Sequence, residues 1–164
     1  MMSNVGLSAG LLLKQIGTPR EVAAFFELIG RHKPESAGHS LALVTDRLYK
    51  RTVPGEAFDA LLEQLHECQR TFRAVPVGPG FWDEFDLGDR SVGLDRSASN
   101  LADAFQRVFD AIDRCVEVAR LDMKNLGYFR PLRLQTLEGP RSYEHEYMPL
   151  EDFEKPDIRP IWLE

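Results

Sequence analysis

The strongest constraint on the fold is a long one-sided apolar stripe between residues 100 and 121. Its members recur every three or four positions over about five helical turns: Leu101, Ala104, Phe105, Val108, Ile112, Cys115, Val116 and Ala119. This spacing predicts a helix with one apolar face, which has to be buried against another layer of structure. A Ser/Asn-rich cap region precedes the stripe and Gly127 ends it.

Three more helices are predicted earlier in the chain. Thr18 and Glu21 have the spacing of a capping box, and an apolar stripe follows it as far as Gly30. A short helix is expected after Ser40, and a longer one over residues 54–74, which carry a second one-sided stripe. The helical part of the chain is therefore three or four helices, each with one face to bury.

Two segments predict strands. Residues 4–13 form a short, mostly apolar run that reads as one buried strand, and residues 128–137 alternate after Pro131, which favours an edge strand or a bulged one. We therefore expect an α+β fold in which a small, mostly antiparallel sheet packs against three to four helices. It forms a single domain over residues 1–138. Residues 139–164 hold four of the chain's 10 prolines, which predicts an extended, acidic tail that packs on the domain or on a partner.

The excess of negative charge is concentrated in two short stretches of this 164-residue chain, whose net charge is −6. Residues 81–89 (FWDEFDLGD) carry four acidic side chains and no basic one, and residues 139–164 carry seven acidic side chains against three basic ones. An acidic chain is poorly suited to the phosphate backbone, so nucleic acid is not an expected partner. Both stretches also carry aromatic residues, and acid beside aromatic suits contact with a basic protein surface.

The stretch 81–89 follows Val75–Gly80, where two prolines and two glycines end a helix, so we expect it to project as a surface loop. In this interpretation Trp82 is an exposed anchor and the neighbouring carboxylates pair with a partner's Lys or Arg side chains. The predicted partner-binding residues are Trp82, Asp83, Glu84, Phe85, Asp86 and Asp89 of the loop, and Glu144 and Glu146 of the tail. The alternative is that Trp82 and Phe85 turn inward as core residues and the carboxylates are only solvated.

Residues for catalysis, metal binding or cofactor binding are not expected. None of the four histidines has ligand spacing, and Glu144-His145-Glu146 is a poor metal site because neighbouring side chains of an extended chain point in opposite directions. Cys68 and Cys115 lie in apolar stripes, where burial is the usual role. Phosphate-binding and nucleophile-elbow motifs are absent from the sequence. These observations favour a binding protein over an enzyme.

The sequence also gives an expectation for the cellular compartment. The N-terminal apolar run is too short for a membrane span of about 20 residues and lacks the flanks of a signal peptide. With only two cysteines, a disulfide framework is not expected. The expected compartment is the cytoplasm.

One family resemblance covers roughly residues 4–121. In chain order the residues that carry it are Val5-Gly6, Gly10, Gln15-Ile16-Gly17-Thr18 before a Phe-rich helix, Leu48-Tyr49, a helix with Leu61 and Leu65, Trp82-Asp83, and a Ser/Asn-led helix with Phe105. This order resembles the bacterial immunity protein 70 family of polymorphic-toxin and contact-dependent growth inhibition systems. The tail has no counterpart in that pattern.

The resemblance implies an antidote: a small cytoplasmic protein that binds and neutralises the C-terminal domain of one cognate toxin. Because the chain is acidic, a basic, nuclease-like toxin domain is the expected partner. Two other functions stay open from the sequence. One is an adaptor or regulatory module that binds a different protein, and the other is an enzyme whose site the sequence does not reveal.

Overall fold

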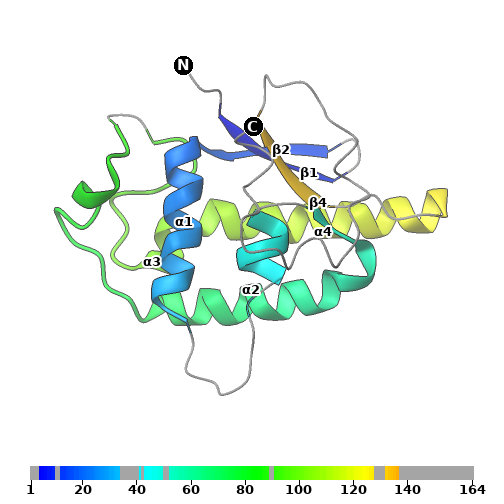
Figure 1. The fold of residues 1–164 in the computed structure, drawn as a ribbon, viewed down its shortest axis with the longest axis horizontal. Helices are drawn as coiled ribbons and strands as arrows, with labels where there is room; N and C mark the ends of the chain where they lie inside the picture. Colours follow the sequence, from blue (N-terminus) through cyan, green and yellow to red (C-terminus); the bar gives the residue numbers. More distant parts are fainter. Residues whose placement is uncertain are drawn as a thin grey trace.

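The computed structural model describes residues 4–9, 12–33, 41, 43–49, 52–88, 91–127 and 132–136. It has the expected α+β fold, with a sheet lying above the long helices (Figure 1). The strands are β1 (Val5–Ala9), β2 (Leu12–Gly17), β3 (Thr52–Val53) and β4 (Leu132–Thr136). The helices are α1 (Pro19–Arg31), α2 (Phe58–Arg73), α3 (Leu101–Ala104) and α4 (Gln106–Leu126), with the short turns η1 (Leu43–Leu48, a π-helix), η2 (Gly55–Ala57, a 3-10 helix) and η3 (Asp83–Phe85, a 3-10 helix).

The sheet has the order β2-β1-β4-β3, and its three pairings are antiparallel. Two expectations about the strands are corrected. The segment expected as one strand over 4–13 is a hairpin, because the chain reverses between Ala9 and Leu12 and both halves pair in antiparallel register. The strand after Pro131 is an interior strand, not an edge strand. Pro131 precedes the first paired residue, Leu132, so its missing N–H does not interrupt the ladder.

The core lies between one face of the sheet and the helices. Leu7 of β1 pairs with Leu134 of β4, and both side chains are buried on the face that α4 covers. Beneath them Phe25 of α1 lies at the centre of an aromatic cluster. Its ring centroid is within 6.0 Å of those of its ring neighbours Phe26, Phe72, Phe105 and Phe109, all in edge-to-face geometry. Edge-to-face rings add to the stability that burial already provides, so this cluster ties α1 to α2 and α4.

Local sequence signals set the helix ends closely. The Thr18 hydroxyl accepts from the Glu21 N–H, and the Glu21 carboxylate accepts from the Thr18 N–H, both at 3.2 Å, so the predicted capping box is confirmed. The helix expected over 100–121 is divided into α3 and α4 at Phe105, whose φ and ψ are −106° and 19°. The apolar stripe ends near residue 121, and the helix continues to Leu126, where Gly127 ends it at φ 80° as predicted.

The two cysteines are free and buried, as expected from their positions in the apolar stripes. Burial raises the pKa of the Cys68 thiol to about 12 and that of Cys115 to about 11. In the described part of the chain, none of the helices combines the length and the apolar character that crossing a bilayer requires. The predicted tail, residues 139–164, lies outside the described residues.

Candidate functional site

Two backbone hydrogen bonds join the two ends of the segment that contains the acidic loop. Val77 N–H donates to the Ser99 carbonyl at 3.0 Å, and Leu101 N–H donates to the Val75 carbonyl at 3.1 Å. Between these bonds the chain makes a long excursion that lies beside α1 (Figure 1). Its two ends are held together, so the excursion has a defined place at the surface.

Trp82 is buried, and the expectation that it is an exposed anchor is wrong. The residue is only 8% exposed. The indole ring meets Phe105 edge-to-face with 5.7 Å between ring centroids, and Phe81 lies 4.8 Å away on the same measure. Two tight turns explain this placement: Phe81 N–H donates to the Gly78 carbonyl and Asp83 N–H donates to the Gly80 carbonyl, which turns the chain back toward the core. Trp82 therefore anchors the excursion to its own domain.

Glu84 is held against α1 by Arg31. The guanidinium donates two parallel hydrogen bonds, Nη1 to Oε1 at 2.9 Å and Nη2 to Oε2 at 3.0 Å. The same group bonds Glu27 at 2.7 Å and lies over the half-buried Phe85 ring, 5.4 Å from its centroid. These bonds lower the pKa of the Glu84 carboxyl and raise the pKa of the Arg31 guanidinium. The carboxylate is thus fixed in place and stays ionised.

Asp86 closes the short turn in an unusual backbone conformation. Its φ of 49° is left-handed, and it is the one non-glycine residue with positive φ in the described part of the chain. Arg20 holds it there, because its Nη1 donates both to the Asp86 carbonyl at 3.1 Å and to the carboxylate at 2.5 Å. The Asp86 side chain is nevertheless 84% exposed. A strained residue that keeps its carboxylate in solvent is a feature common at binding sites.

Together these side chains form what we call the α1–η3 surface: Glu27, Asp83, Glu84 and Asp86 with Arg20 and Arg31. Four carboxylates against two guanidinium groups leave it negative. Asp83 is exposed, and among the described residues it has no ion-pair partner. The structure therefore places Asp83, Glu84 and Asp86 close together at the surface, and their contact with a partner stays a prediction. The remaining predicted residues, Asp89, Glu144 and Glu146, lie outside the described part of the chain.

The second half of the excursion is held by the carboxylate of Glu21, which the sequence predicted only as part of the helix cap. Glu21 is buried, and it accepts hydrogen bonds from the N–H groups of Val92 and Gly93 at 3.2–3.4 Å. Gly93 lies so close to β2 that an added Cβ would be 1.6 Å from the Ile16 carbonyl oxygen. The capping box thus has a second role, since the same side chain starts α1 and secures the loop.

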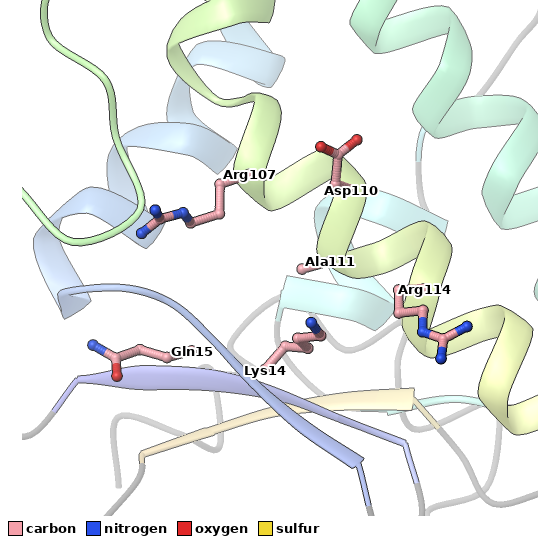
Figure 2. A pocket seen from close by; sticks show the side chains of 6 residues that line it. All are labelled: Lys14, Gln15, Arg107, Asp110, Ala111 and Arg114. Atoms are coloured by element: carbon pink, nitrogen blue, oxygen red, sulfur yellow. The ribbon is translucent and has the colours of Figure 1, made fainter.

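A second charged feature lies between β2 and α4, as a pocket of about 550 Å³ (Figure 2). Its lining residues are Lys14, Gln15, Arg107, Asp110, Ala111 and Arg114. Sequence reasoning missed this pocket because its two sides are more than 90 positions apart. One signal was available, since Arg107 and Arg114 are seven residues apart and share a face of a helix.

The described residues contain no group of three or more His, Cys, Asp or Glu side chains arranged to hold a metal ion. His66 of α2 instead contacts Asp113 of α4 at 3.2 Å between Nε2 and Oδ1, on the exposed side of the two helices.

Searches against protein-family models, curated proteins and solved structures find no match to this chain.

Proposed function

We propose that this protein is an immunity protein, which binds and neutralises one cognate toxin domain carrying a basic surface. The observation that carries the proposal is the α1–η3 surface: three neighbouring carboxylates, Asp83, Glu84 and Asp86, are exposed, and ion pairs hold Glu84 and Asp86 at defined positions. The family resemblance in the sequence supports the same function.

Carboxylates on a fixed segment favour a fast and specific encounter with a cationic partner. A negative surface steers a basic partner into contact and raises the association rate constant. Glu84 and Asp86 are already positioned by Arg31 and Arg20, so less conformational freedom is lost on binding. An antidote gains from both effects, because the toxin has to be captured before it acts.

The burial of Trp82 changes how this surface would bind. With the indole packed on Phe105, the contact relies on charge and on the half-buried Phe85 more than on a large exposed aromatic anchor. Trp82 then acts indirectly, since it supports the segment that presents the carboxylates. The proposed mode is stoichiometric binding in the cytoplasm, without turnover.

The test is direct, because an immunity gene is expected to lie beside the gene of its toxin. The C-terminal domain of the large protein encoded next to this gene is co-expressed with the chain, and complex formation and cell survival are measured. A stable complex that protects the cells is the expected result. If the neighbouring domain is toxic and this chain neither binds it nor protects against it, the proposal is refuted.

The role of the α1–η3 surface needs a matched pair of variants. The first carries Asp83→Asn, Glu84→Gln and Asp86→Asn together. The second removes the same charge at the start of α2, by Glu56→Gln, Asp59→Asn and Glu63→Gln, which are exposed acids, one of them ion-paired with Arg120. We expect only the first variant to slow association and to flatten its dependence on ionic strength. Equal slowing by both would place the contact elsewhere.

A further inference from the structure

The pocket between β2 and α4 is a cationic site in an acidic chain. It is lined by three cations and one carboxylate, whereas the whole chain has a net charge of −6. Figure 2 shows Lys14 rising from β2 toward α4, and Arg107 and Arg114 coming from two successive parts of α4. A local concentration of positive charge against the overall sign of the protein is what a site for an anionic group requires.

Most of the positive charge in this pocket is not neutralised by the groups that contact it. Lys14 is exposed, and no described carboxylate lies within ion-pair distance of it. Arg107 donates to a neutral group, the Val92 carbonyl, through Nη1. Arg114 contacts Glu117 at 3.1 Å, while the pocket's own carboxylate, Asp110, accepts from Gln106 at 2.8 Å. Lys14 and Arg107 are therefore cations without a carboxylate partner among the described residues.

The floor of the pocket is the edge of the sheet. In the order β2-β1-β4-β3, β2 pairs with β1 on one side and with no described strand on the other. Gly93 packs on the Ile16 carbonyl, so that end of β2 is already covered and the edge in question is Leu12–Gln15. An edge strand presents unpaired N–H and C=O groups at alternate residues, which another extended chain can bond. Lys14 and Gln15 are both exposed at this edge. A peptide backbone can bond the N–H and the C=O groups alternately along the strand, whereas phosphate groups offer acceptors only, which favours a peptide as the occupant.

We propose that this edge and pocket bind an extended acidic segment of a partner protein, added as a strand beside β2. Carboxylates at alternate positions of such a strand are spaced by about 6.7 Å and point to one face. Arg107 and Arg114 are separated by about 10.5 Å along α4, as seven residues of helix require, with Lys14 between them and the sheet. Two alternating carboxylates fit within that span, and a third would extend about 3 Å beyond it. This site is opposite in charge to the α1–η3 surface and does not depend on the partner being a toxin.

The probe is a capped seven-residue peptide in which glutamate alternates with valine, titrated into the full-length protein and followed by backbone NMR. The control peptide has glutamine at each glutamate position. We expect shifts centred on β2 with the first peptide and at least several-fold weaker binding of the second. Methylating the alternate peptide nitrogens that face β2 should abolish binding, since it removes the strand pairing. Equal binding of the two unmethylated peptides would overturn the acidic specificity.

The protein variants are Lys14→Gln and, as a matched control, Lys124→Gln, an exposed lysine of α4 outside this pocket. Loss of one ion pair should raise the dissociation constant of the acidic peptide about two- to fivefold in the first variant and leave it unchanged in the second. The same weakening in both would show only long-range attraction and would refute the site.

Two other occupants are distinguished in the same experiment. If inorganic phosphate or a short oligonucleotide displaces the peptide at equal charge, the site recognises anions without a strand and the proposal fails. If the β2 amides that do not bond β1 are protected from hydrogen exchange in the free protein and lose protection in the variant Glu144→Gln/Glu146→Gln, the chain's own C-terminal segment fills the edge. That outcome would also overturn a partner strand.

Discussion

Arg31 of α1 and Glu84 of η3 face each other through two parallel hydrogen bonds, at 2.9 and 3.0 Å, although 53 positions separate them in the chain. This pair and the Arg20–Asp86 pair dock the acidic segment along α1. Glu84 and Asp86, which we predicted to contact a partner, thus also bond the domain's own α1. Their partners inside the molecule determine where any basic partner would meet them.

The Arg31–Glu84 pair should make stability depend on pH in acid. Because Arg31 lowers the pKa of the folded Glu84 carboxyl, its contribution is present above the pKa of the unfolded chain and is lost as pH falls through the lower, folded value. Denaturant melts of wild type and Glu84→Gln should therefore differ most near neutral pH and converge in acid. The control is Glu63→Gln, and a difference that does not shrink on acidification would contradict this assignment.

Removing the Trp82 side chain should destabilise the domain and release the excursion from the core. The ring is buried against Phe105, so Trp82→Ala should cost about 3–5 kcal/mol of the free energy of unfolding, as large-to-small core substitutions do. Trp82→Phe keeps part of the packing and should cost less. Thermal and denaturant melts measure both. A normal melting temperature combined with lost partner binding would show instead that Trp82 is a direct contact.

Gly93 should tolerate no side chain. Its Cβ would be 1.6 Å from the Ile16 carbonyl oxygen, and backbone cannot move aside as a flexible side chain can. We expect Gly93→Ala to lower the free energy of unfolding by about 1–3 kcal/mol or more, by the cost typical of overpacking. Gly78→Ala is the matched control, since nothing lies within 4 Å of its added Cβ. Equal stability of the two variants would mean that the loop can detach from β2 at little cost.

The two thiols should be inert until the protein unfolds. Burial raises the pKa of Cys68 to about 12 and of Cys115 to about 11, so few thiolates form at pH 8. An alkylating reagent should modify both cysteines slowly in the native protein and rapidly in denaturant, as mass spectrometry can follow. Cys68→Ala and Cys115→Ala should each reduce stability without weakening partner binding. Fast labelling of the native protein would reveal an exposed thiol that the packing does not show.

Periodicity and caps predicted most of the helices because these signals are local. The capping box at Thr18 and the stripe from Leu101 depend on residues within a few positions of one another, and both match the structure closely. The hairpin at Ala9–Leu12 was missed because a short apolar run looks the same whether it is one strand or two. The interior place of β4 depends on β3, a two-residue strand with no sequence signal of its own.

The sequence by itself determined the α+β class, the main helices with their buried faces, and the charges available for binding, since periodicity, capping and composition act over short stretches of chain. Tertiary structure decided how those residues are used. Trp82 is buried because it packs on Phe105 in the core. Glu84 pairs with Arg31 because α1 and η3 pack side by side. The cationic pocket formed because β2 and α4 bring Lys14 beside Arg107. Contacts between distant residues depend on how the layers pack, which no local pattern specifies.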